Sequence, residues 1–376
     1  MHKLIALVIA LTAIAGATQR TPMATIPGPQ GVPEGASPVV AAQNGILAVA
    51  YAQVGPEVYL YAIPNWSSPI ATLTLSDPNA FINSIAIQNN YIAVAEDDPA
   101  SRHPVAVYIF PKPESGWSSE SETAILTPSN PSDDGFGAIS VWGGTLLASG
   151  RDCAYIFLKP EGGWVNATEN AQLTPSDNPQ TFCCGVALTG NVGSGGSLAV
   201  IGATVGQDGY ITAYVYVEPE GGWTSMTQTA ELTSQRGTGD VAVSAAKSTI
   251  AIGSPILHGQ QNEPYGGIDI YAEPGGGWTN SSTPTYIVSV PQNAYSIGGA
   301  ATLTQSAQVL VSGYGFSNFK KGYQDLAYLW HADKEFGSSI TLSAAGYTKS
   351  LEAATVTADY AFAWDIFGNI FIFDGK

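Results

Sequence analysis

Short apolar runs recur along the chain at intervals of about fifty residues. Each run has aliphatic residues bounded by turn-forming or polar residues, which is typical of a buried β-strand. Seven runs are present: Leu47-Ala48-Val49, Ile92-Ala93-Val94, Leu146-Leu147-Ala148, Leu198-Ala199-Val200, Ile250-Ala251-Ile252, Val309-Leu310-Val311 and Ala361-Phe362-Ala363. Because Gly, Pro or Asn interrupts the apolar pattern about every eight to twelve positions, a helical fold is excluded.

Each period contains four segments with strand character. The first alternates small and apolar residues (138–141), the second is the apolar run, and the third is rich in β-branched and aromatic residues (107–110). A turn with Gly and Trp follows (161–164), and the fourth segment has the pattern Ala-x-Leu-Thr (171–174). The indole of this turn is expected to cover the edge of the adjoining repeat. Trp66 and Trp330 are assigned to the same turn position without the glycines.

Repetition of a four-strand unit at this period predicts blades arranged in a ring. The last repeat ends after its third strand, and Met23–Pro27 resembles the missing fourth strand. Pairing of that segment beside Ile370–Phe373 would close the ring and remove exposed sheet edges. The predicted fold class is therefore all-β, a seven-bladed β-propeller of four-stranded antiparallel blades, with the last blade closed by the N-terminal strand. A ring of six or eight blades is the alternative.

The start of the chain has the pattern of a secretory signal. His2 and Lys3 precede an apolar run, Leu4–Ile14, that is too short to span a bilayer, and Ala15–Ala17 fits a cleavage site. We expect a signal peptide over 1–17 and a protein that is secreted, or at the cell surface or in the periplasm depending on the host, with no membrane span in the mature chain. A retained anchor is the alternative. The expected domains are 1–17 and a single propeller over 18–376, with blades at approximately 36–75, 82–127, 137–174, 184–233, 239–289, 296–342 and 349–373 plus 23–27.

The chain is acidic, with a formal net charge of −17 over 376 residues. A surface of this sign disfavours nucleic acids and anionic membranes as partners, and we expect a monomer. Three cysteines do not form a zinc site, and a disulfide is predicted between Cys153 and either Cys183 or Cys184. N-glycosylation sequons occur at Asn65, Asn166 and Asn280, each between the third and fourth strands of its repeat.

One repeat carries a family resemblance. The phrase Phe136-Gly137-x-x-Ser140-Val141, followed by Leu146–Ala148, an aromatic third strand, Gly-Gly-Trp and Ala-x-Leu-Thr, resembles the FG-GAP repeat. That repeat builds the propeller of integrin α subunits and of many secreted microbial proteins. The resemblance covers about 23–376 and implies the fold, without specifying a function.

The chain departs from that family in its Phe-Gly element and in its loops. Phe182-Cys183 and Tyr295-Ser296 replace Phe-Gly in blades four and six. Many family members carry an Asp-rich calcium loop between the first two strands of a blade, but here this connection has sequences such as Gln43-Asn44-Gly45. Calcium requires several oxygen ligands, usually including carboxylates, so no metal and no cofactor is expected.

Catalytic motifs are not found in the sequence. There is no Gly-x-Ser-x-Gly or His-Glu-x-x-His, and His103, His258 and His331 fall in three different repeats. Carboxylate pairs such as Asp97-Asp98 and Asp133-Asp134 have the pattern of solvated turns. The chain is therefore predicted to be no enzyme. A polysaccharide-active hydrolase or lyase that uses acidic loop residues is kept as an alternative.

The long connections gather on one side of the predicted ring. We call this side the long-loop face: it carries the connections from strand two to strand three, and from strand four to the next blade. The Gly-Trp turns lie on the opposite face. Variable loops on a rigid scaffold commonly form binding sites. The candidate binding residues on the long-loop face are Arg102, His103, His258, Tyr265, Phe316, Phe319, Lys320, Lys321 and Tyr323.

The sequence therefore predicts a secreted, non-enzymatic propeller that binds an extracellular protein or glycan through its long-loop face. Two alternatives remain. The long loops could be neutral insertions, or the protein could be a lectin with sugar sites repeated between the blades, where Trp or Tyr stacks on pyranose rings.

Overall fold

The computed structural model describes most of the chain, and β-strands form its regular structure. The described residues are 18–29, 38–51, 54–97, 105–130, 136–177, 179, 181–190, 196–205, 210–234, 237–238, 242–254, 256–257, 267–288, 300–304, 309–313, 327–332, 336, 339–343, 351–365 and 367–376. Within these ranges no helix is long and apolar enough to cross a membrane.

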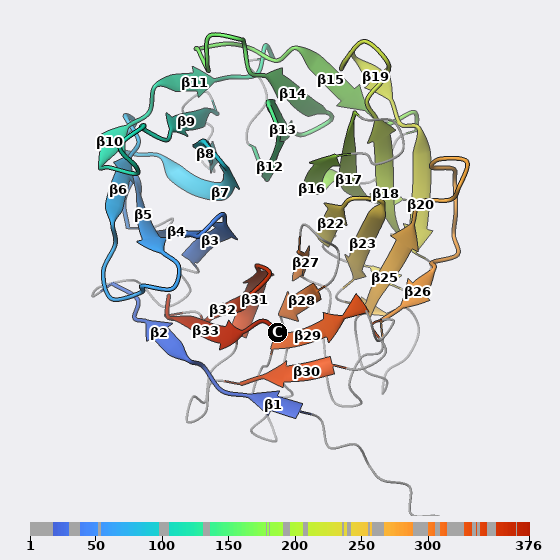
Figure 1. The fold of residues 1–376 in the computed structure, drawn as a ribbon. Helices are drawn as coiled ribbons and strands as arrows, with labels where there is room; N and C mark the ends of the chain where they lie inside the picture. The colour runs from blue at the N-terminus through green and yellow to red at the C-terminus, as the bar shows by residue number, and fades with distance from the viewer. Residues whose placement is uncertain are drawn as a thin grey trace, which may run out of the picture.

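The chain forms a seven-bladed β-propeller, as predicted (Figure 1). In each blade four antiparallel strands follow one another from the centre outward. Blades one to three are β3 (Pro38–Gln43), β4 (Ile46–Tyr51), β5 (Glu57–Ala62) and β6 (Ala71–Thr74); β7 (Phe81–Gln88), β8 (Tyr91–Asp97), β9 (Val107–Pro111) and β11 (Ala124–Leu126); and β12 (Ile139–Trp142), β13 (Thr145–Ser149), β14 (Ala154–Leu158) and β15 (Ala171–Thr174).

The remaining blades repeat this order. They are β16 (Thr181–Gly190), β17 (Ser197–Val205), β18 (Tyr210–Val217) and β20 (Ala230–Ser234); β22 (Ala242–Ala246), β23 (Thr249–Ser254), β25 (Gly267–Ala272) and β26 (Tyr286–Ile287); β27 (Ala300–Leu303), β28 (Val309–Gly313), β29 (Ala327–His331) and β30 (Ser339–Leu342); and β31 (Leu351–Val356), β32 (Tyr360–Asp365), β33 (Ile370–Asp374) and β2 (Ala24–Ile26). A separate pair joins β21 (Gly237–Thr238) to β24 (Ile256–Leu257) beside blades four and five.

The N-terminal strand closes the ring. β2 pairs antiparallel with β33, with Ala24 opposite Ile372 and Ile26 opposite Ile370. Figure 1 shows blue β2 lying alongside red β33. Ile26 is buried at this seam, so its side chain contributes hydrophobic area as well as main-chain pairing.

A fifth, parallel strand lies on the outer edge of three blades, which the sequence analysis did not foresee. β10 (Glu120–Ser121) pairs with β6, β19 (Met226–Thr227) with β15, and β1 (Thr18–Arg20) with β30. Single parallel bridges, Leu126 to Ala167 and Leu232 to Ser281, occupy the same place on blades two and four. In each of these places the segment before the fourth strand of one blade lies on the fourth strand of the preceding blade. The outer edges are therefore partly covered, which limits pairing with other chains.

Among the described residues the hydrophobic core forms seven clusters, and each one joins two neighbouring blades. Trp164, in the turn of blade three, contacts Tyr91 of blade two with ring centroids 5.4 Å apart. This confirms the expected role of the turn indole. The assignment of Trp330 to such a turn is wrong, because Trp330 is fully buried inside β29. In blade six, Phe336 takes the turn position and lies 6.4 Å from Tyr286 of blade five.

Candidate functional site

The predicted binding residues of the long-loop face lie outside the described residues. These are Arg102, His103, His258, Tyr265, Phe316, Phe319, Lys320, Lys321 and Tyr323. The side chains of Cys183 and Cys184, in β16, are likewise outside the described part, so the disulfide with half-buried Cys153 stays a prediction. The structure instead describes the places where these loops leave the strands.

Hydrogen-bonded polar pairs, buried or partly buried, hold the bases of the loops. At the end of β8 the Glu96 carboxylate accepts a hydrogen bond of 3.0 Å from the Tyr108 hydroxyl, and both residues are buried. Burial raises the pKa of the Tyr108 phenol above its usual value, and the neighbouring Glu96 charge raises it further. A charge-assisted bond in this position fixes the start of the connection between strands two and three.

A hydrogen bond from a tyrosine hydroxyl to a carboxylate also occurs at the connection between strand four and the next blade. The Tyr214 hydroxyl donates to Asp177 at 2.6 Å, and burial together with that carboxylate raises the pKa of Tyr214. One blade further on, the strand position of Tyr214 is taken by Asp269, which accepts a bond of 2.7 Å from Ser234. Asp269 and Ser234 are both buried. These contacts tie the loop bases to the blade cores.

Blade seven has a compact turn on this face. The fully buried Asp365 carboxylate accepts hydrogen bonds from the main-chain N–H groups of Phe367 and Asn369 and from the Asn369 amide. Asn369 in turn accepts a bond of 3.2 Å from the main-chain N–H of Gly28. The turn between β32 and β33 is thereby joined to the chain that follows β2.

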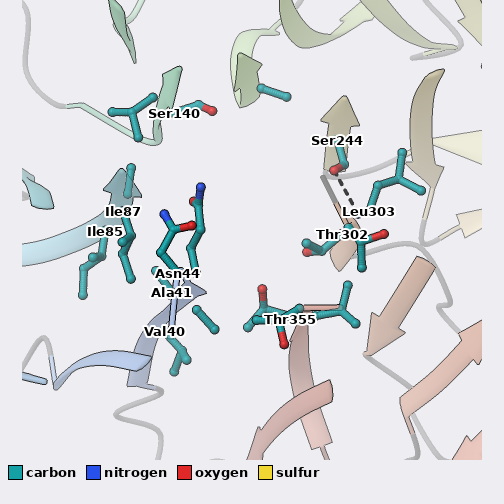
Figure 2. A pocket seen from close by; sticks show the side chains of 18 of the residues that line it. Val40, Ala41, Asn44, Ile85, Ile87, Ser140, Ser244, Thr302, Leu303 and Thr355 are labelled. Atoms are coloured by element: carbon teal, nitrogen blue, oxygen red, sulfur yellow. Dashed lines mark hydrogen bonds between the residues drawn. The ribbon is translucent and has the colours of Figure 1, made fainter. Parts of the chain in front are cut away.

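A central channel of about 890 Å³ runs through the ring. Its wall comes from the first strand of every blade: β3, β7, β12, β16, β22, β27 and β31. Figure 2 shows side chains that line it, among them Ser140 and Thr355 from these strands and Asn44 from the turn after β3. The volume lies within the range of about 300–1,000 Å³ that is typical of ligand pockets. The sequence analysis identified these strands but named no residue of the channel they line as a binding residue.

The channel wall is nearly free of charge. Among its described lining residues, Asp359 is the one charged side chain, and it forms an ion pair of 2.9 Å with Lys376. The remaining lining residues are aliphatic, hydroxyl, amide and aromatic. No group of three metal-ligating side chains occurs in the part of the chain that the structure describes.

Serine side chains join neighbouring blades along the channel. Ser140 of β12 accepts a hydrogen bond of 2.9 Å from the main-chain N–H of Leu188 in β16. Ser244 of β22 accepts one of 3.0 Å from Leu303 in β27, drawn as a dashed line in Figure 2. Each bond satisfies a donor on the inner edge of a blade, which has no further strand to pair with.

The sequon residues are exposed on the outer rim. Asn65, Asn166 and Asn280 all lie between the third and fourth strands of their blades. Asn166 and Asn280 each accept a main-chain hydrogen bond from the preceding blade, at 2.8 and 2.9 Å. Their accessibility is compatible with glycosylation, which stays a prediction.

The comparisons with known proteins identify a fold. No protein-family model and no curated protein sequence matches the chain. Among solved structures, one from the mitotic checkpoint complex aligns with a TM-score of 0.63 and 12% identity, over 98% of this chain and 100% of that chain. The WD40 propeller domain of Doa1 aligns with a TM-score of 0.58 and 10% identity, over 95% and 97%. Virginiamycin B lyase from Staphylococcus aureus aligns with a TM-score of 0.54 and 9% identity, over 93% and 98%. At these identities the likeness concerns the fold alone: this chain is similar to β-propellers along nearly its whole length.

Proposed function

We propose that the protein is an exported, non-enzymatic β-propeller that binds an extracellular protein or glycan through its long-loop face. The observation that carries this proposal is the set of buried or partly buried hydrogen bonds at the loop bases. Tyr108 with Glu96, and Tyr214 with Asp177, fix two loop bases to the blade cores. A rigid base lowers the entropy cost of ordering a loop when a partner binds.

The proposal includes that the protein is not an enzyme, and the side chains that line the channel support this part. Its described wall presents one carboxylate, Asp359, which is already paired with Lys376. General acid–base chemistry on a saccharide requires two carboxyl groups placed on either side of the reacting bond. The described channel wall does not provide such a pair.

Export is supported by the pattern of the first seventeen residues, which has a basic start, a short apolar run and a small-residue cleavage site. A chain cut at that site keeps both N-terminal strands. N-terminal sequencing of protein recovered from the culture medium of its native host tests this part: Thr18 as first residue is expected, and an intact Met1 in cell-bound protein would overturn it.

Binding through the long-loop face is tested by replacing its predicted aromatic residues. Phe316→Ala, Phe319→Ala and Tyr323→Ala, combined in one variant, are expected to abolish capture of the partner from native extracellular fluid while the unfolding transition stays unchanged. The matched control replaces two exposed apolar residues on the rim, Val165→Ser and Ile287→Ser. Loss of capture in the control, or full capture by the triple variant, would count against the assigned face.

A further inference from the structure

The innermost strand of each blade presents a free main-chain edge to the channel. In an antiparallel ladder alternate residues direct N–H and C=O away from the partner strand. Just before β12, the Ala138 carbonyl accepts a hydrogen bond from the Ser149 N–H of the partner strand β13. Because the direction alternates along a strand, Ile139 and Val141 direct their N–H and C=O groups toward the channel. The Ile139 N–H donates to Ser84 of blade two at 3.1 Å, which agrees with this assignment.

At one equivalent position of the inner strands, the blades differ in whether a serine of the preceding blade accepts a hydrogen bond from the main-chain N–H group. The N–H groups of Leu188 and Leu303 are satisfied by Ser140 and Ser244 of the preceding blades. The residue that corresponds to these serines is Ala41 in blade one, Ala86 in blade two and Ala187 in blade four. The corresponding donors are the N–H groups of Ile87, Val141 and Ala245, and an alanine cannot accept their hydrogen bonds.

Three main-chain donors from three different blades therefore face the channel without a side-chain acceptor at this position. Ile87, Val141 and Ala245 all line the cavity. Water can satisfy such groups, and a ligand that offers oxygens in the same places replaces that water. The donors are distributed around a circle rather than along one strand. A ring bearing several hydroxyl groups fits this arrangement better than an extended peptide does.

An exposed indole lies where the channel opens on the face that carries the hairpins between strands one and two. Trp142 ends β12, lines the cavity and is 37% exposed. Gly190 of blade four provides space for its ring, because a Cβ at Gly190 would lie 2.8 Å from Cζ2 of Trp142. A positioned aromatic face suits an amphipathic ring with apolar C–H faces.

We propose that the channel is a binding site for a short, uncharged oligosaccharide, which enters at the hairpin face, stacks on Trp142 and accepts hydrogen bonds from Ile87, Val141 and Ala245. The wall has no described cation for an anionic sugar, and its one carboxylate is paired with Lys376. This site lies away from the long-loop face, so it is independent of partner binding there.

The experiment uses isothermal titration calorimetry of the mature chain with maltotriose, cellotriose, xylotriose and mannotriose, and with trigalacturonate as the charged control. At least one neutral trisaccharide is expected to bind, and trigalacturonate is not. Trp142→Ala should weaken that binding about tenfold or more. Binding of none of the four neutral sugars at millimolar concentration would overturn the proposal, as would equal binding by the Trp142→Ala variant.

A second variant separates ligand binding from folding. Ala187→Ser places a hydroxyl where Ser140 and Ser244 stand in blades three and five, so it should satisfy the Ala245 N–H and remove one ligand donor. The expected result is a higher melting temperature together with affinity reduced several-fold. Val165→Ser on the outer rim is the control and should change neither quantity. Unchanged affinity in a more stable Ala187→Ser variant would contradict the assigned donors.

Discussion

The side-chain oxygen of Asn166 in blade three accepts a hydrogen bond of 2.8 Å from the main-chain N–H of Ile125 in blade two. The same contact joins other neighbouring blades through the residue two positions after the turn Trp. It pairs Ser119 with Thr72, Ser225 with Gln172 and Asn280 with Glu231, at 3.0, 3.0 and 2.9 Å. In these four repeats one acceptor thus fastens the turn to the outer strand of the blade before it.

Asn166→Ala should lower the free energy of unfolding by about 1 kcal/mol, because the acceptor is lost. Asn166→Ser should stay close to wild type, because serine performs this task at Ser119 and Ser225. Both variants destroy the sequon, so their difference in urea unfolding reports the hydrogen bond and not a glycan. Thr168→Ala, which removes the sequon and keeps the acceptor, is the control. Equal stability of the Ala and Ser variants would contradict the role of this contact.

The blades could be predicted because the residues of each strand indicate which of its positions are buried. In β15 the pattern Ala-x-Leu-Thr alternates buried and partly exposed positions, as the period of two requires. The contact between Asn166 and Ile125 depends on the spacing of two blades, which no single repeat specifies. The sequence nevertheless indicates it, since Ser or Asn follows Trp by two positions in the four repeats whose turn has Gly before Trp.

The functional site was less predictable. Residues such as Ser140 and Ala187 have ordinary strand patterns, and only ring closure turns them toward a shared channel. Trp330 was placed in a turn because it directly follows the segment 326–329, which was taken to be the whole third strand. The third strand of blade six in fact contains Trp330, and Phe336 fills the turn position without the usual glycines.

Hydrogen bonds join the two ends of the described chain. The Arg20 guanidinium, in β1, donates to the main-chain carbonyl oxygens of Asp374 and Lys376. Arg20→Ala should lower the free energy of unfolding by about 1 kcal/mol, and Arg20→Lys should recover only part of it because an ammonium lacks the planar fork. Urea denaturation measures both. A lysine variant as stable as wild type would show that charge alone suffices.

Removal of both N-terminal strands should have a larger effect. A chain without residues 18–27 loses β1 and β2 and exposes the edge of β33, together with the surface covered by Ile26. An unpaired edge of this kind promotes association between chains. We expect oligomers in light scattering after size-exclusion chromatography, where the full ring elutes as a monomer. A monomeric, cooperatively unfolding truncated chain would contradict closure by β2.

Tyr91→Phe should stabilise the protein. The Tyr91 hydroxyl is buried, and among the described residues it has no hydrogen-bond partner, while its ring contacts Trp164. Removing an unsatisfied buried hydroxyl should add about 1 kcal/mol in urea unfolding at neutral pH. Burial also raises the pKa of this phenol. The unfolded chain therefore releases the proton first above about pH 10, and native stability that is complete below that pH falls above it. The phenylalanine variant should lose less stability there.

Tyr108→Phe, the same substitution on the adjacent strand, should lower the free energy of unfolding at neutral pH, whereas Tyr91→Phe should raise it. The Tyr108 hydroxyl donates to the buried Glu96 carboxylate, so its removal takes one hydrogen-bond donor away from that carboxylate. A loss of about 1.5–3 kcal/mol is expected, the range for bonds to charged groups. The double variant Tyr108→Phe, Glu96→Gln should recover part of this loss, because a neutral amide costs less to bury than a carboxylate. If Tyr108→Phe and Tyr91→Phe shift the urea midpoint in the same direction, burial alone governs these phenols and the Glu96 contact contributes nothing to the loop base.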